Sequence, residues 1–276
     1  MKAEEVIEEL QGADRMLNIA KNINILGNFC GKRDLSALTS EQLENRYGIP
    51  QADVMVLFGG SILAGGDVFA DAIRNKVAKK YVIGGGAGHT TEALRQKVHL
   101  EYPEIETAGL SEAEVFQKYL RSVYGCSADY LEKQSTNCGN NITYLLELLK
   151  EHGISWKSMI LSQDATMQRR MEAGLQKYVK DDVLIINYAA YSVKVTPSGT
   201  ELVYEDEPHG MWDMERYVNL LMGEIPRLSD DENGYGPNGK GFIAHVDIPP
   251  EVRNAFDELC KVYSVREANP LYASKI

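Results

Sequence analysis

The chain has 276 residues, of which 44% are hydrophobic and 25% are charged, and its formal net charge is −11. This balance is typical of a globular protein with a sizeable core and about two domains of ordinary size. The acidic excess argues against nucleic acid and anionic membranes as partners, because both attract clustered Lys and Arg.

The sequence shows no targeting or membrane-spanning segment. No run reaches the ~18 apolar residues that cross a bilayer, and the start MKAEEVIEEL lacks the basic and apolar regions of a secretory signal. The four cysteines contain no C-x-x-C pair, which predicts neither a zinc site nor a disulfide framework. We therefore expect a cytoplasmic protein with no metal site and no membrane partner.

Residues 1–48 are expected to form two or three helices ahead of the main fold. Apolar residues recur there at helical spacing, and Gly27 and Gly31 interrupt the pattern.

Residues 49–192 alternate between short apolar runs and amphipathic segments. The apolar runs predict strands at 52–58, 79–84, 128–133, 156–163 and 182–190. The segments between them predict helices at 67–78, 89–102, 111–125, 140–153 and 164–179. Repeated strand–helix units of this length specify an α/β fold, here a Rossmann-like, mostly parallel sheet flanked by helices.

Residues 193–276 are expected to form a mainly helical lobe together with the N-terminal helices. The stretch 194–207 is polar and turn-rich, whereas 209–223 and 249–264 have helical patterns. The segment 229–241 is a loop by composition. We expect the last helix to pack back on the first ones.

Two glycine-rich turns follow the first two predicted strands, and ligands of open α/β sheets bind beyond the carboxyl ends of strands. Their candidate ligand-binding residues are Gly59, Gly60, Ser61, Gly84, Gly85, Gly86, Gly88 and His89. The second turn opens a helix whose amides favour an anion. Neither turn matches the P-loop or the full G-x-G-x-x-G fingerprint. Tight turns and close helix–strand packing are the alternative explanation.

A third strand end carries a dense polar cluster. Its candidate residues are Ser135, Thr136, Asn137 and Asn141. Their hydroxyl and amide groups suit an uncharged polar ligand such as a ribose or a base. A role in capping the following helix is the alternative for any one of them.

The fourth strand end contributes Asp164, Gln168 and Arg169. Asp164 is a candidate helix cap as well as a ligand contact. An arginine at a helix N-terminus opposes the helix dipole, so Arg169 or Arg170 is a candidate clamp for a carboxylate or phosphate. A salt bridge to an acid such as Glu172 is the alternative.

Glu112 is the weak catalytic candidate, as a general base at the start of a helix. Acidic residues are also common there because they complement the helix dipole. Ser111 and Glu114 have the spacing of a capping box.

Taken together, the motifs LFGG, VIGGGAGHTTE, SEAE, QSTNCGNN and QDATMQRR resemble the bacterial domain-of-unknown-function family that includes YdcF, SanA and ElyC. The tail from Glu215 to Val252 resembles the YdcF-like branch, and the resemblance covers about Ala52 to Val252. It implies a Rossmann-like fold and association with S-adenosyl-L-methionine. It does not imply an established methyltransferase activity, and the envelope roles of anchored members do not transfer.

The family positions that this resemblance carries over are Gly59, Gly60, Gly84, Gly85, Glu112, Ser135, Thr136, Asn137, Asn141, Gln168 and Arg169. Two positions depart from the family pattern. Asn140 stands where members usually have Glu, and Thr166 stands where wider members tend to have His. The loss of an acid and a histidine weakens acid–base catalysis at this site.

We therefore expect a nucleotide-type ligand-binding protein, with S-adenosyl-L-methionine or a related adenosyl compound as its ligand. Two alternatives remain open: a non-catalytic small-molecule sensor, and a hydrolase acting on a phosphorylated or nucleotide substrate. The sequence does not decide whether the protein is an enzyme or whether it forms oligomers.

Overall fold

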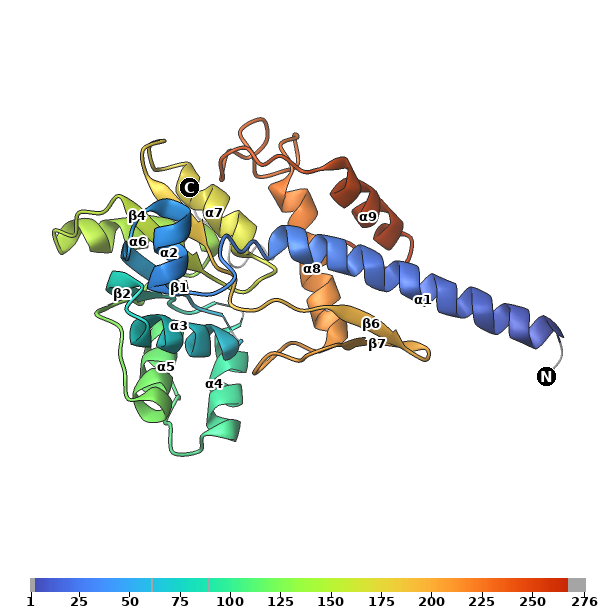
Figure 1. Ribbon diagram of the computed structural model, residues 1–276, viewed down its shortest axis with the longest axis horizontal. Helices are drawn as coiled ribbons and strands as arrows, with labels where there is room; N and C mark the ends of the chain where they lie inside the picture. The colour runs from blue at the N-terminus through green and yellow to red at the C-terminus, as the bar shows by residue number, and fades with distance from the viewer. Residues whose placement is uncertain (1–2, 61, 89, 268–276) are drawn as a thin grey trace.

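A five-stranded parallel sheet forms the centre of the molecule (Figure 1). The computed structural model describes residues 3–60, 62–88 and 90–267, with side chains from residue 12 onward. The strand order is β3-β2-β1-β4-β5. The strands are β1 (Ala52–Phe58), β2 (Ala78–Gly84), β3 (Tyr130–Glu132), β4 (Ser158–Ser162) and β5 (Leu184–Asn187). The expected Rossmann-like α/β fold is confirmed.

Helices cover both faces of the sheet. One face packs against α2 (Ser40–Tyr47), α3 (Ala64–Arg74), α4 (Thr91–Glu101) and α5 (Glu112–Tyr119). The other packs against α6 (Cys138–Glu151) and α7 (Gln168–Gln176). Strands covered on both faces are continuous apolar runs, and this is why β1 reads ADVMVLF without polar alternation.

α5 begins at the predicted capping box. The Ser111 hydroxyl accepts from the Glu114 amide, and the Glu114 side chain accepts from the Ser111 amide. The helix continues directly into a π-helical turn, η1 (Leu120–Tyr124). The start of α5 is therefore fixed, and with it the position of Glu112.

The N- and C-terminal segments join in an accessory lobe beside the sheet. Its elements are α1 (Ala3–Cys30), the hairpin β6 (Val195–Ser198) and β7 (Glu201–Tyr204), α8 (Met214–Leu228) and α9 (Pro250–Cys260). α1 runs between α9 and the hairpin and crosses α8 (Figure 1). The expected packing of the last helix on the first is confirmed.

Three details of the lobe differ from expectation. α1 continues through Gly27, because this glycine lets Tyr217 approach: a Cβ there would lie 2.5 Å from the tyrosine hydroxyl. The stretch 194–207 forms a hairpin. α8 starts at Met214, five residues later than expected, because Gly210 has a left-handed φ of 69° and Asp213 caps the helix.

No helix in the described part of the chain is both long and apolar enough to cross a membrane.

Candidate functional site

The connections of the sheet reverse direction between β1 and β4. β1 leads to β2 on one side, whereas β4 leads to β5 on the other. Open α/β sheets bind ligands at the carboxyl ends of the strands at such a switch point. Gly59 and Gly60 follow β1 there, and Gln163 and Asp164 follow β4.

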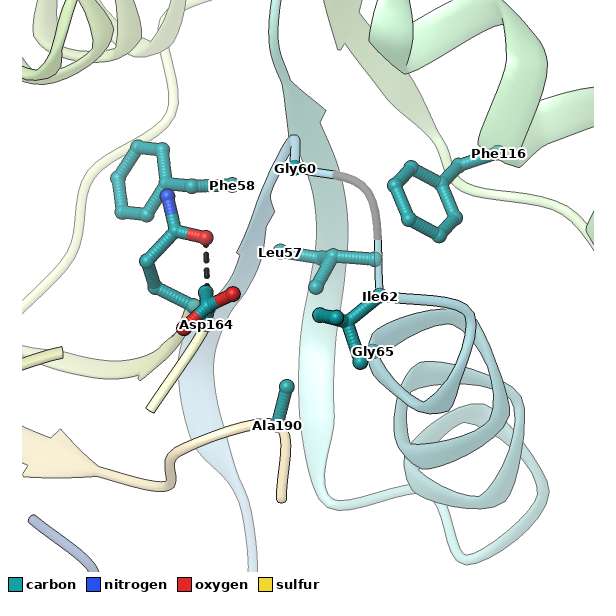
Figure 2. Close-up of a pocket in the computed structure, with 9 residues that line it drawn as sticks. Leu57, Phe58, Gly60, Ile62, Gly65, Phe116, Asp164 and Ala190 are labelled. Carbon is teal, nitrogen blue, oxygen red and sulfur yellow. Dashed lines mark hydrogen bonds between the residues drawn. The ribbon is translucent and has the colours of Figure 1, made fainter. Parts of the chain in front are cut away.

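A small cavity lies at this switch point. Its volume is about 10 Å³, which is room for about one water molecule. Figure 2 shows how its residues gather around the loop after β1; they are Leu57, Phe58, Gly60, Ile62, Gly65, Phe116, Gln163, Asp164 and Ala190. Pockets for drug-sized ligands measure about 300–1,000 Å³. The site is therefore closed in this structure, and a nucleoside needs it to open.

The two glycine turns converge, because β1 and β2 are neighbours, but the protein already uses four of their amides. Four glycine N–H groups donate within the loops. The Gly59 amide donates to the Gly84 carbonyl (2.6 Å) and the Gly85 amide to the Glu132 carbonyl (2.9 Å). The Gly86 amide donates to Ser135 Oγ (3.1 Å) and the Gly88 amide to Thr91 Oγ1 (2.7 Å). A phosphate cradle needs open amides, so these turns do not form one in this structure.

Close packing explains two of the glycines. A Cβ at Gly59 would lie 2.5 Å from Glu112 Oε2, and a Cβ at Gly86 would lie 2.3 Å from the Ser135 carbonyl oxygen. Both distances are far below van der Waals contact. The alternative explanation of the glycines, close approach of neighbouring loops, therefore accounts for these positions.

Glu112, the first residue of α5, lies between the two turns and is 7% exposed. Its Oε1 accepts hydrogen bonds from the hydroxyls of Thr90 and Thr91, each at 2.9 Å. Its Oε2 lies against Gly59, 2.5 Å from where a Cβ on that glycine would stand. Burial raises the pKa of Glu112, and the two hydroxyls offset only part of this effect. A buried carboxyl with a raised pKa is suited to acid or base chemistry.

Asp164 lines the cavity and is 3% exposed. Its Oδ1 accepts from the Thr166 amide and hydroxyl and from the Tyr191 hydroxyl. Its Oδ2 accepts from Trp212 Nε1 at 2.8 Å. α7 begins only at Gln168, so the expectation that Asp164 caps this helix is wrong. Asp164 instead joins the carboxyl end of β4 to the accessory lobe.

Two glutamines brace the strand ends. Gln163 Nε2 donates to the Gly59 carbonyl across the switch point at 3.2 Å. Gln168 is fully buried, accepts from the Gln163 amide, and donates to Leu161 and Asn187. Both polar groups of Gln168 are thus engaged within the protein, and it positions β4 against β5.

The polar cluster after β3 divides into separate roles. Ser135 is 2% exposed and receives the Gly86 amide. Asn137 is the N-cap of α6 and accepts from the Asn140 amide, as the capping alternative states. Thr136 is exposed, whereas Asn141 is buried. Only Ser135 of this cluster contacts the glycine turns through a hydrogen bond among the described residues.

Three buried oxygens in the described part of the chain have no hydrogen-bond partner: Glu132 Oε2, Asn141 Oδ1 and Ser162 Oγ. Glu132 and Ser162 are the last residues of β3 and β4. Buried polar groups without partners are uncommon, and two of the three are acceptors only. The carboxyl edge therefore offers acceptors to a ligand that brings hydrogen-bond donors.

The two arginines of α7 are engaged elsewhere. Arg169 Nε donates to the Phe29 carbonyl at 2.5 Å, and its guanidinium lies 4.2 Å from the Phe29 ring centroid. Arg170 forms a bidentate pair with Glu224 of α8, at 2.6 and 3.0 Å. Glu224, and not Glu172, is thus its partner. Neither arginine clamps an anion at the switch point in this structure.

Ser61 and His89, two of the expected ligand contacts, lie outside the described residues. Among the residues that are described, no group of three or more His, Cys, Asp and Glu side chains is placed to hold a metal ion.

Sequence reasoning missed Glu132, Gln163 and Tyr191, and it missed the contact of Trp212 with Asp164. Glu132 ends a strand and Gln163 directly follows one, so the strand-end rule could have included both. Nothing in the local sequence indicates that Tyr191 and Trp212 reach Asp164, because that contact depends on how the lobe packs.

Comparison with known families assigns no relationship: no protein-family model matches this chain.

Proposed function

We propose that the carboxyl edge of the sheet binds a nucleoside-type ligand that carries no phosphate, and that S-adenosyl-L-methionine or a related adenosyl compound is that ligand. The position of the site at the β1–β4 switch point supports a small-molecule ligand of this size class. The resemblance to YdcF-like proteins supports the adenosyl group.

The observation that carries the proposal is the excess of acceptors over donors at this edge. Glu132 Oε2 and Asn141 Oδ1 accept no hydrogen bond from the described residues, whereas four glycine amides of the turns and both α7 arginines are engaged. Ribose hydroxyls, an adenine amino group and an ammonium all donate. A phosphate donates nothing when ionised, and buried carboxyl groups repel it. The hydrolase of phosphorylated substrates is therefore the weaker alternative.

The sensor alternative keeps one specific observation in its favour. Trp212 of the lobe donates directly to Asp164 of the cavity wall. A ligand that replaces this hydrogen bond would move the lobe, and no covalent bond would form or break. Glu112 is the candidate general base if the bound ligand is turned over.

A binding assay separates these possibilities. Isothermal titration should show binding of S-adenosyl-L-methionine, S-adenosylhomocysteine or adenosine, with ATP and inorganic phosphate binding more weakly. Glu112→Ala should lower the affinity for the adenosyl compounds about tenfold or more, as expected for the loss of a buried hydrogen-bond acceptor. Glu151→Ala, at the exposed end of α6, is the control.

Two results would overturn the proposal: no binding of any adenosyl compound, or tighter binding of ATP than of adenosine. Mass spectrometry of the ligand after incubation then distinguishes an enzyme from a sensor.

A further inference from the structure

The segment 207–213, here called the strap, crosses from the accessory lobe onto the sheet domain. Figure 1 shows the chain leaving β7 toward α4 before it enters α8. The His209 carbonyl accepts from the Ala64 amide at 2.9 Å, and the Gly210 carbonyl accepts from Lys97 Nζ at 2.7 Å. Gly210 packs against Leu63, where a Cβ would lie 3.0 Å from the leucine backbone nitrogen. The strap is thus fastened to α4 and to the N-terminus of α3.

Trp212 ties the strap to the cavity. The indole is 9% exposed, and its N–H donates to Asp164 Oδ2 at 2.8 Å. Lys97 Nζ lies 4.7 Å from the indole ring centroid and forms a cation–π contact with the ring. Asp164, Ile62 and Gly65 line the cavity, and the strap braces the segments that carry them. A closed strap is consistent with a cavity of only about 10 Å³.

His209 fastens the strap through both of its ring nitrogens. Nδ1 lies 2.8 Å from Asp67 Oδ2 on α3, and Nε2 lies 2.7 Å from Glu101 Oε1 on α4. Each nitrogen needs a hydrogen to bond a carboxylate, so the arrangement is complete only for the protonated imidazolium. We call these three residues the clasp.

Of the three residues of the clasp, His209 is the one whose charge we expect to change near neutral pH. Burial lowers the pKa of His209, but the hydrogen bonds to Asp67 and Glu101 outweigh this and raise it above its ordinary value. Asp67 Oδ1 also accepts from the hydroxyls of Tyr119 and Tyr124.

The neighbouring tyrosines have pKa values above that range. The pKa of Tyr124 is raised to about 12, by burial and then by Asp67, and those of Tyr119 and Tyr102 are raised as well. Burial lowers the pKa of Lys97 from its ordinary value, and Asp164 and Asp213 offset part of this. Lys97 donates to the strap backbone and forms no part of the clasp.

We propose that the strap is a lid over the switch-point cavity, held shut by the clasp of His209 with Asp67 and Glu101 and released when His209 loses its proton. The identity of what enters rests on the proposed function, but the opening of the strap does not. A raised folded-state pKa means that the closing contribution is complete below about pH 6.5 and is lost as the pH rises through the pKa of His209.

The test uses Trp212 as a reporter that needs no ligand. The chain has two tryptophans, so Trp156→Phe leaves Trp212 as the single one. Acrylamide quenching of its fluorescence should increase about twofold or more between about pH 6 and pH 9, as expected for a population shift to an open strap. His209→Gln should give the high value at every pH.

A second histidine provides the matched control. His245 also lies between two carboxylates, Asp230 at 2.6 Å and Asp247 at 3.1 Å, and these hydrogen bonds raise its pKa. It is in the loop after α8, so His245→Gln should leave the Trp212 profile unchanged. Glu101→Gln, at the partly exposed end of the clasp, should move the transition to lower pH and keeps the proposal testable if His209→Gln does not fold.

Quenching that does not change with pH, or a profile that responds to His245→Gln and not to His209→Gln, would overturn the lid. Binding of S-adenosyl-L-methionine is measured separately. Its affinity should fall at low pH in the wild type and stay constant in His209→Gln, because a closed lid lowers the competent fraction. Absence of binding with an intact quenching profile would reject the proposed function and leave the lid standing.

Discussion

Asp164 is 3% exposed and accepts hydrogen bonds from four donors of the protein. Asp164→Asn places an amide N–H₂ where one carboxylate oxygen now accepts, so it opposes either Trp212 or the Thr166 and Tyr191 donors. The free energy of unfolding should fall by about 1.5–3 kcal/mol, the range for a hydrogen bond to a charged group.

Urea denaturation followed by circular dichroism measures this change. Asp206→Asn, at an exposed position beyond β7, is the control and should shift the midpoint little. A stability of Asp164→Asn within error of the control would mean that the four hydrogen bonds contribute nothing net.

Neutralising Glu112 should increase the stability at high pH, whereas neutralising Asp164 should decrease it. Burial raises the folded-state pKa of Glu112 above the unfolded value, so the folded state binds this proton more tightly. The resulting stability is present at low pH and is lost as the pH rises through the unfolded and then the folded pKa. Glu112→Gln cannot ionise and escapes this loss. Its melting temperature at pH 8 should exceed that of the wild type by about 2–4 °C for each kcal/mol recovered.

Near pH 4 the difference between the two proteins should be small, because Glu112 is then mostly protonated in both states. Differential scanning calorimetry across this pH range tests the sign, with Glu151→Gln as the control. A destabilised Glu112→Gln at pH 8 would show that the carboxylate is the form that the fold prefers.

The helices and strands of the sheet domain follow from local patterns, whereas the contacts between elements do not. Apolar runs such as ADVMVLF predict β1, because a strand that is covered on both faces is mostly apolar along its length. The β6–β7 hairpin escapes the same reasoning, because each strand has only four residues and Pro197 argues against a strand. Gly27 is the clearest example. A glycine at this position predicts a break in the helix, whereas the structure shows that it makes room for Tyr217, 190 positions later in the chain.

The candidate site follows the same division. Placing it at strand ends was possible from the sequence, because the parallel topology brings Gly59, Gly85 and Asp164 to one edge. The hydrogen-bond partners of those residues could not be predicted from the sequence. Whether an amide faces a ligand or a neighbouring loop depends on distances such as that from Gly86 to Ser135, which no local pattern encodes.

The pair of Arg170 and Glu224 links α7 to α8. It is bidentate, and the Glu224 side chain is 2% exposed. Arg170→Met should cost about 3–5 kcal/mol, because it removes the bidentate partner of a buried carboxylate, which Arg227 contacts at 3.6 Å. The double variant Arg170→Met and Glu224→Met should recover most of this loss, since well-packed apolar side chains often replace a buried ion pair at little cost.

A double-mutant cycle in urea measures the coupling. Additive single losses, with no recovery in the double variant, would show that α7 and α8 are held by packing alone.

One of the three hydrophobic clusters of the described residues crosses the boundaries at residues 48 and 192 that the sequence suggests. A single cluster of buried residues contains members from all three segments, among them Ile23 and Leu26, then Ala165 and Ala190, then Leu221. The strap and the Arg170–Glu224 pair add polar links across the same junction. A core that crosses both boundaries cannot be exposed on one side without exposing the other, so we expect a single cooperative unfolding transition.

Two tryptophans make this expectation measurable. Trp156 precedes β4 and packs against the core between the sheet and α6, whereas Trp212 lies in the strap and belongs to the shared core. Trp156→Phe and Trp212→Phe each leave one reporter. After correction for the stability change of each variant by circular dichroism, the fluorescence midpoint in urea should match the circular dichroism midpoint of the same variant. A Trp212 signal that changes at lower urea than its circular dichroism would mean that the lobe detaches before the sheet unfolds. In that event the strap opens as part of a separating domain and not as a lid on an intact molecule.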